Sequence, residues 1–264
     1  LYRSTDLRQW ECEGEMTFPD ADGAFDAFGY MWECPNLVRL TDEETGEARD
    51  VLIFCPQGIS PDREGFENVF PCVAVVGELV GTELRGADGS FEELDRGTEF
   101  YAPQIMARSA STPPDAPTLL FGWAGNAGED DQPSIETGGT APRALALRGG
   151  RVIARPYLPG LPLAPATLEG APGDEAGARV VELVGSRSWR LSFDASYEGA
   201  LSVRIGSGSG LDVTLEEGRL TVDLTGTRYP HGGRRVVTLD AGEARRVEIL
   251  HDRSITEIYL GDGS

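Results

Sequence analysis

The sequence contains no lysine, because all 23 of its basic residues are arginine. Chemistry that needs a lysine amine, such as Schiff-base formation, a phosphate-loop lysine or a Ser-Lys dyad, is therefore excluded. The sequence also has no apolar run long enough to cross a membrane. The chain starts at Leu1 with neither a basic start nor an apolar segment of a signal peptide, as a fragment also would, and the cysteine usage described next predicts a cytoplasmic protein.

Histidine and cysteine are scarce. His231 lies in a turn-like stretch and His251 at a strand end, which argues against His-centred acid–base chemistry, catalytic triads and zinc hydrolysis. The cysteines show no C-x-x-C spacing and no nearby histidine, so we predict reduced thiols in preference to disulfides. Neither a metal nor an organic cofactor is expected. The four cysteines are Cys12, Cys34, Cys55 and Cys72.

Charge of one sign dominates: 44 acidic residues against 23 basic ones give a net charge of −21. Such a surface repels a phosphate backbone and an anionic membrane, so we expect neither nucleic acid nor membrane as a partner. The simplest interpretation of the net negative charge is that it keeps the protein soluble.

Short periodic segments bounded by Gly, Asp, Pro or Ser run along the whole chain, and no segment carries a helical stripe. The predicted class is therefore all-β. Hairpin turns are expected at residues 148–151, 206–210 and 216–219, and a surface loop at 107–118. The predicted strands are 51–54, 73–76, 118–123, 144–147, 152–154, 180–184, 191–193, 201–205, 211–215, 220–224, 235–239, 247–250 and 255–260.

A change in composition predicts two domains. Pro, Gly and Ala dominate residues 158–177, where the strand pattern lapses, so this segment is interpreted as a linker. Aromatic residues gather before it, in 1–157, while closely spaced strands and turns follow in 178–264 and indicate a β-sandwich.

With lysine and histidine set aside, carboxylates are the remaining candidates for chemistry, and a pair of carboxylates is typical of glycoside hydrolysis. Glu33 has the most unusual setting, between Trp32 and the Cys34–Pro35 step, which favours an extended backbone. Apolar walls would raise the pKa of a glutamate, as a general acid at neutral pH requires. The alternative is a strand-end glutamate paired with an arginine.

The motif MWECPNL around Glu33 resembles the Glu-Cys-Pro motif of glycoside hydrolase family 32, the invertases, β-fructofuranosidases, sucrose-6-phosphate hydrolases and fructanases. The resemblance extends in the right order along nearly the whole chain. Its further segments are LYRSTDLRQWECEG at the start, VLIFCPQG, ELDRGTEFYAPQ, LLFGWAGN, APRALALRGGRVIARP, and VEILHDRSITEIYLGDG near the end.

The resemblance implies a five-bladed β-propeller followed by a β-sandwich, and a retaining hydrolase of terminal β-fructofuranosyl units. Glu33 matches the family's acid/base. The small-molecule partner implied is a sugar, sucrose or a related fructoside. The residues then implied in substrate binding are Trp32, Cys34, Tyr101 and Trp123.

Two family motifs are absent from the sequence. The nucleophilic aspartate belongs to Trp-x-Asn-Asp-Pro-Asn and a substrate-holding aspartate to Arg-Asp-Pro, and neither stretch occurs here. Glu99 and Ala144 also replace residues that are usually aspartate and acidic, respectively. We therefore expect a fragment that lacks the N-terminal blades and the last sandwich strands, and that is inactive alone.

Two other functions stay open. A non-catalytic fructoside-binding or relic protein of the same fold would bind sugar without turnover, although a partial propeller would leave sheet edges unpaired. Within the enzyme class, fructan hydrolysis or fructosyl transfer is the alternative to hydrolysis of sucrose or its 6-phosphate.

Overall fold

A computed structural model shows strands joined by turns and loops, with no α-helix in the described part of the chain. It therefore contains no helix there that could cross a membrane. The described residues are 1–59, 71–108, 111–125, 138–161, 187–194, 201–206, 210–227, 230, 233–239, 246–261 and 263.

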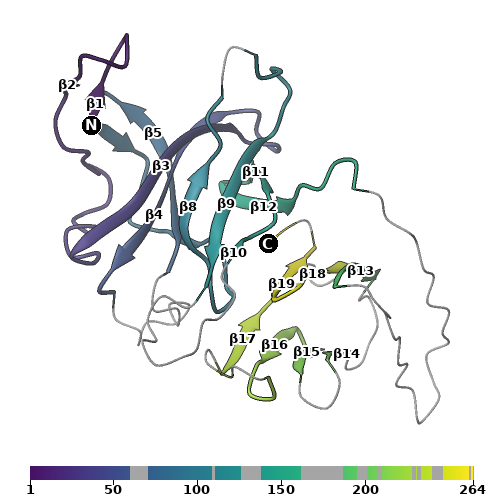
Figure 1. Cartoon of the computed structure of the whole chain (residues 1–264). Helices are drawn as coiled ribbons and strands as arrows, with labels where there is room; N and C mark the ends of the chain where they lie inside the picture. Colours follow the sequence, from purple (N-terminus) through teal and green to yellow (C-terminus); the bar gives the residue numbers. More distant parts are fainter. Residues whose placement is uncertain are drawn as a thin grey trace.

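The first large sheet is an antiparallel meander in the order β3-β4-β5-β6, with β7 also paired to β5. A small hairpin of β1 and β2 precedes it near the N-terminus (Figure 1). The bounds are β1 Tyr2–Arg3, β2 Glu11–Cys12, β3 Met31–Thr41, β4 Ala48–Gln57, β5 Val73–Val80, β6 Glu83–Arg85 and β7 Glu92–Glu93.

The second sheet repeats this meander. Strand β9 pairs with β8 and with β10 and β11, and β12 closes the sheet beside β11. Successive antiparallel meanders of this kind are the blades of a β-propeller. The bounds are β8 Tyr101–Ile105, β9 Thr118–Ala124, β10 Gly138–Gly139, β11 Arg143–Arg148 and β12 Arg151–Pro156.

Strand β4 explains how the blades pack. Its side chains alternate between two cores: Ile53 joins the core between the two blades, while Leu52 and Phe54 join the core that covers the other face of the first blade. Successive side chains of a strand point to opposite faces, so a strand buried on both faces is apolar throughout. This accounts for the unbroken apolar run that predicted the strand.

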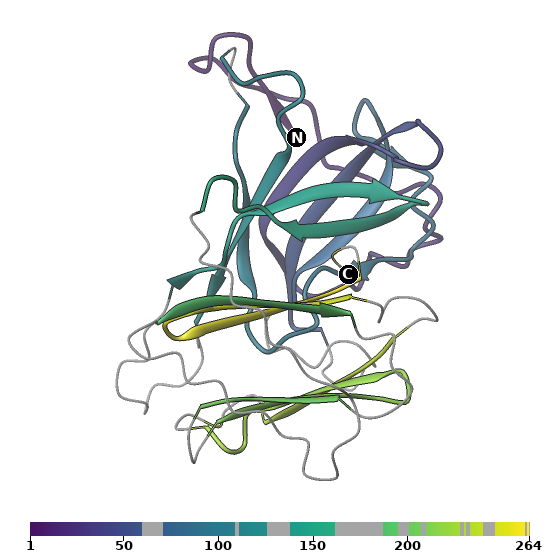
Figure 2. The same cartoon turned by 90° about the vertical axis from the view of Figure 1, so that its right-hand side faces the viewer.

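The remaining strands form two stacked sheets, which Figure 2 shows one above the other below the blades. One sheet has the order β13-β18-β19 and the other β14-β15-β16-β17, and a shared apolar core lies between them. The bounds are β13 Ser188–Asp194, β14 Leu201–Ile205, β15 Leu211–Glu216, β16 Arg219–Asp223, β17 Arg234–Thr238, β18 Arg246–Asp252 and β19 Ile255–Leu260.

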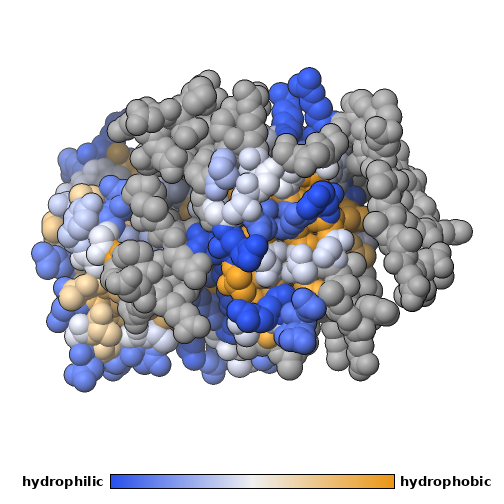
Figure 3. Space-filling model, turned by 90° about the horizontal axis from the view of Figure 1, so that it is seen from below, coloured by the Kyte–Doolittle hydropathy of each residue, from blue (hydrophilic) through white to orange (hydrophobic). Residues whose placement is uncertain are grey.

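Seen from below, the coloured residues are a mixture of hydrophilic and apolar side chains, and the apolar ones are most visible in the middle and right of the face (Figure 3). A backbone hydrogen bond joins the C-terminal end of the described chain to the second blade: the Ala154 N–H donates to the carbonyl of Gly263 at 3.0 Å.

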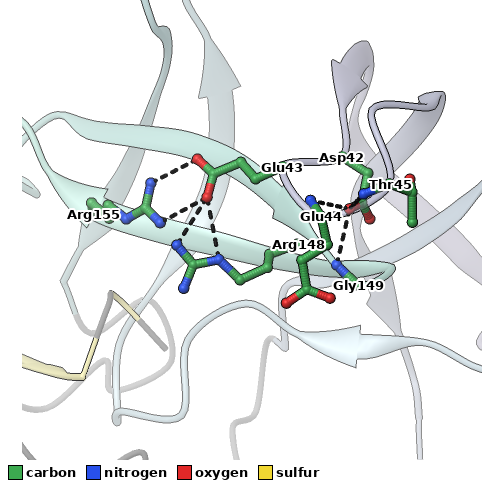
Figure 4. Close-up of polar contacts among 7 residues, drawn as sticks. All are labelled: Asp42, Glu43, Glu44, Thr45, Arg148, Gly149 and Arg155. Carbon is green, nitrogen blue, oxygen red and sulfur yellow. Dashed lines mark hydrogen bonds and ion pairs between the residues drawn. The ribbon is translucent and has the colours of Figure 1, made fainter.

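The two blades are joined by a polar cluster at their turns (Figure 4). Asp42, which is buried, accepts four backbone N–H bonds: Oδ1 from Glu44, Thr45 and Gly149 at 2.9, 3.1 and 3.1 Å, and Oδ2 from Gly150 at 2.8 Å. Two of these donors lie in the turn of the first blade and two in that of the second.

The neighbouring Glu43 extends this cluster through ion pairs. Its carboxylate accepts from Arg148 at 2.9 Å and from Arg155 at 3.1 Å. The Gly150 N–H bond, followed by the other backbone donors and opposed by burial, lowers the pKa of Asp42 to about 2. The hydrogen bonds from Arg155 and Arg148 lower the pKa of Glu43 to about 2.

We expect this cluster to lose its stabilising effect in acid. The ordinary pKa values of Asp42 and Glu43, 3.8 and 4.5, exceed their folded values of about 2, so the unfolded chain binds these protons first as pH falls. Their contribution is complete above about pH 5 and is lost towards pH 2. Asp42→Asn should lower the free energy of unfolding at neutral pH. The difference in this free energy between the variant and wild type should become smaller as the pH falls.

This expectation is checked by measuring the urea unfolding midpoint of the full-length protein at a series of pH values. Glu11→Gln, on the exposed strand β2, is the matched control and should leave the acid dependence unchanged. A constant difference between Asp42→Asn and wild type from pH 6 to pH 2.5 would contradict a role for the Asp42 carboxylate charge.

The structure confirms the all-β prediction and most of the predicted strands. The turns at 148–151 and 216–219 are tight hairpins, with φ of +56° and +81° at Gly149 and Gly150. The predicted strand at 180–184 and His231 lie outside the described residues, as do parts of the turn at 206–210, the loop at 107–118 and the linker at 158–177. The domain boundaries stay a prediction.

Candidate active site

Glu33 and Tyr101 meet where the two blades face each other. Glu33 lies on β3 and Tyr101 on β8, the edge strands of their sheets, which contact one another (Figure 1). The Tyr101 hydroxyl donates a hydrogen bond to Oε2 of Glu33. Both side chains are half-buried. We call this contact the β3–β8 interface.

A bulge on each strand shapes this interface. Glu33 pairs with Cys55 but Asn36 pairs with Ile53, so two residues of β3 face one residue of β4. Strand β8 has the same irregularity between Tyr101 and Gln104. A bulge bends its strand and re-aims the side chains beside it.

The two bulges have the same local sequence pattern. Cys34-Pro35 follows Glu33, and Ala102-Pro103 follows Tyr101. Cys34 and Ala102 both have a left-handed backbone, with φ of +50° and +48°. The extended backbone predicted for Cys34 is therefore wrong, because Cys34 lies in the bulge. Non-glycine residues rarely adopt the left-handed conformation, and each costs about 1–3 kcal/mol unless its surroundings hold it in place.

Gln57, at the end of β4, supports the tyrosine. Its Nε2 group donates to the Tyr101 hydroxyl at 3.4 Å, and Gln57 is buried. Burial, followed by the hydrogen bond to Glu33, raises the pKa of Tyr101. Tyr101 therefore keeps its proton over the range of neutral pH and can act as a donor to Glu33.

Trp123 lies next to Tyr101 on the neighbouring strand. The two residues are paired in register, and their ring centroids are 6.2 Å apart with the planes tilted by 55°. Trp123 is half-buried. Its predicted contact with a sugar stays a prediction, and its position beside Tyr101 is compatible with it.

Trp32 belongs to a different environment from Glu33. Its ring stacks on Phe54 with centroids 4.1 Å apart and makes edge contacts with Phe18, Phe25 and Phe28. Its Nε1–H donates to the carbonyl of Phe28 at 2.7 Å. These contacts give the ring a packing role in the core behind the first blade. A substrate-binding role for Trp32 is not needed to explain its position and stays a prediction.

The thiols near the site differ in exposure. Cys34 is exposed, while Cys55 and Cys72 are buried, and all are free. Partial burial of the thiol, followed by the nearby Cys55 and Glu33, raises the pKa of Cys34. A neutral thiol beside Glu33 adds no charge to the site. Within the described residues no cluster of His, Cys, Asp and Glu has the arrangement of a metal site.

A buried arginine lies behind the second blade. Arg143 on β11 makes ion pairs of 2.8 Å with Asp95 and with Glu257 of the sandwich, and its guanidinium lies 4.4 Å from the ring centroid of Phe100. Burial opposes its charge, but the two carboxylates outweigh this effect and raise the pKa of Arg143. Phe100 precedes Tyr101, so this network adjoins the site.

Three residues in and beside the site were not predicted from the sequence: Asn36, Gln57 and Arg143. Asn36 lies in the motif MWECPNL and Gln57 in VLIFCPQG. The shared pattern of Glu33-Cys-Pro-Asn and Tyr101-Ala-Pro-Gln could have indicated a role for Asn36. Nothing in the sequence indicates that Arg143 pairs with an acid 114 residues away.

The fold and the site together define a class: an all-β protein with propeller blades, a carboxyl group held between two of them, and a β-sandwich. The sequence model of the glycosyl hydrolases family 32 N-terminal domain matches residues 1–156. The chain belongs to glycoside hydrolase family 32.

Similar proteins agree with this family. The sucrose-6-phosphate hydrolase of Klebsiella pneumoniae is 33% identical over the whole chain, which covers 52% of that protein. The enzyme of the same description from Salmonella typhimurium is 39% identical over 59% of this chain and 32% of its own length. A Bombyx mori GH32 β-fructofuranosidase matches in structure with a TM-score of 0.71 at 24% identity, over 99% of this chain and 53% of that one. The chain therefore spans about half the length of relatives that it matches throughout.

Proposed function

We propose that the protein containing this chain is a retaining β-fructofuranosidase that releases terminal fructose from sucrose, sucrose 6-phosphate or short fructo-oligosaccharides. The observation that carries the proposal is the Glu33 carboxyl group, held at the β3–β8 interface by the Tyr101 hydroxyl. The names of the relatives support the substrate class, since several are sucrose-6-phosphate hydrolases and a solved neighbour was crystallised with sucrose.

In this proposal Glu33 is the acid/base. Tyr101 occupies Oε2, whereas Oε1 accepts no hydrogen bond from the described residues and is the oxygen available to a substrate. Glu33 first gives its proton to the glycosidic oxygen as the bond to the anomeric carbon breaks. It then removes a proton from the water that hydrolyses the fructosyl-enzyme. The Tyr101 donor stabilises the carboxylate that exists between these steps.

The chain supplies the acid/base but not the nucleophile. Retaining hydrolysis needs a second carboxyl group about 5–5.5 Å from the first. The family's aspartate for that role belongs to a Trp-x-Asn-Asp-Pro-Asn stretch, which this sequence does not contain. Contacts of the sugar with Trp123, Tyr101, Cys34 and Trp32 are further proposals. So are the three-segment domain layout and a cytoplasmic location.

The test compares the full-length protein with the 264-residue chain. With sucrose or sucrose 6-phosphate, the full-length protein should release fructose that NMR detects first as the β-furanose anomer. The isolated chain, checked for folding by circular dichroism, should release none. Fructose release by the isolated chain that Glu33→Gln abolishes would contradict the missing nucleophile. Binding without turnover by the full-length protein would favour the non-catalytic alternative.

A further inference from the structure

Asn36 uses its whole hydrogen-bonding capacity at the β3–β8 interface. Its Nδ2 group donates to the carbonyls of Cys34 at 2.9 Å and Pro103 at 2.8 Å. Its Oδ1 atom accepts from the Ile105 N–H at 3.0 Å and from Nε2 of Gln104 at 3.2 Å. A side-chain amide has two donors and two acceptor sites, so all four are engaged.

These bonds replace a backbone connection that the two blades lack. Among the described residues, no ladder of backbone hydrogen bonds joins β3 to β8, because the two strands are edges of different sheets. Their separation must therefore be set by side chains. Three of the four bonds of Asn36 cross to β8, and two of these reach its backbone, at Pro103 and Ile105.

The same amide holds both bulges. The Cys34 carbonyl belongs to the bulge after Glu33, and the Pro103 carbonyl to the bulge after Tyr101. Both bulges contain a left-handed residue, whose cost must be offset by local contacts. Each bulge aims a functional side chain, so the Nδ2 group of Asn36 fixes the two backbone segments that bring Glu33 and Tyr101 together.

We propose that Asn36 is a positioning residue for proton transfer, which joins the two bulged strands and thereby directs the Glu33 carboxyl group at the glycosidic oxygen. The proposal rests on the proposed function of Glu33. Asn36 itself touches neither substrate nor reacting atoms in this scheme. Its effect passes through the orientation of Glu33 and the hydrogen bond from Tyr101.

The test uses two substrates that differ in their need for an acid. The leaving group of sucrose is glucose, a poor leaving group that needs a proton, whereas 4-nitrophenyl β-D-fructofuranoside releases the stable 4-nitrophenolate anion without one. In the full-length protein, Asn36→Ala should lower kcat/KM for sucrose by about 10²-fold, because small misplacements of a catalytic group have effects of this size. For the aryl fructoside the loss should stay below about tenfold, because acid catalysis contributes little there.

Two further variants make the result specific. Asn36→Ser keeps a polar group beside Cys34 but is too short to bridge to Pro103, so it should show the same selective loss even if Asn36→Ala folds poorly. Gln104→Ala removes a single bond to Asn36 and should behave nearly as wild type. Equal losses with both substrates in both Asn36 variants would indicate a purely structural role and overturn the proposal.

Glu33→Ala in the same assays distinguishes a failure of the positioning role of Asn36 from a failure of the proposed function. If Glu33→Ala shows the selective loss and the Asn36 variants do not, only the positioning role is wrong. If Glu33→Ala cleaves sucrose as well as wild type, the proposed function itself fails.

Discussion

Glu33→Gln in the full-length protein is expected to lower kcat/KM for sucrose by about 10²–10⁴-fold, the usual contribution of a positioned general acid. Glutamine keeps the shape of the side chain and can accept the Tyr101 hydrogen bond, but it has no proton to give to the glycosidic oxygen. Initial rates of fructose release from sucrose measure this loss.

A matched variant shows whether this loss is specific. Glu47→Gln changes a glutamate of the same blade whose side chain is 59% exposed and pairs with Arg49, away from the β3–β8 interface. It should keep wild-type kcat/KM. A Glu33→Gln enzyme within about tenfold of wild type would exclude Glu33 as the acid/base, because general acid catalysis contributes more than this.

Arg143→Ala is expected to have the largest effect on stability, a loss of about 3–5 kcal/mol in the free energy of unfolding. The Arg143 side chain is 6% exposed, and its removal leaves the carboxylates of Asp95 and Glu257, 18% and 9% exposed, without their cation. Breaking a buried ion pair by removing one partner is costly because the other charge remains desolvated. Urea unfolding of the full-length protein measures the change.

Two comparisons identify the cause of that loss. Arg204→Ala removes an arginine that is 63% exposed and pairs with Asp212, and should change the free energy of unfolding far less than Arg143→Ala does, because an exposed ion pair contributes little to stability. Adding Asp95→Asn and Glu257→Gln to Arg143→Ala should restore part of the lost stability, because it removes the unpaired charges. No recovery in this triple variant would show that packing on Phe100 and Tyr259, rather than charge, is lost.

Predictions from the sequence succeeded where one local pattern decides the structure. Strand β19 was predicted with its observed bounds, 255–260, because apolar residues and flanking turn residues agree there. The hairpin at Gly149 and Gly150 follows from the preference of glycine for positive φ.

The prediction missed β3, although this strand carries the Glu33 motif. Its Cys34–Pro35 step interrupts the alternation that marks a strand, and the interruption is the bulge itself. The role of Trp32 also depends on information outside the motif, because its stacking partner Phe54 and its neighbour Phe25 come from other segments. Such contacts are fixed by the tertiary fold, so a reading of local sequence cannot supply them.

The ion pair between Arg143 and Glu257 also has a consequence for the order of synthesis. The two residues are 114 positions apart, and at about 5–20 residues per second the ribosome delivers Glu257 about 6–23 s after Arg143. During that interval the second blade has Asp95 as a partner for the arginine but not the sandwich carboxylate. The nascent blade therefore completes its electrostatic pairing only when the β18–β19 hairpin emerges, which couples maturation of the second blade to synthesis of the sandwich.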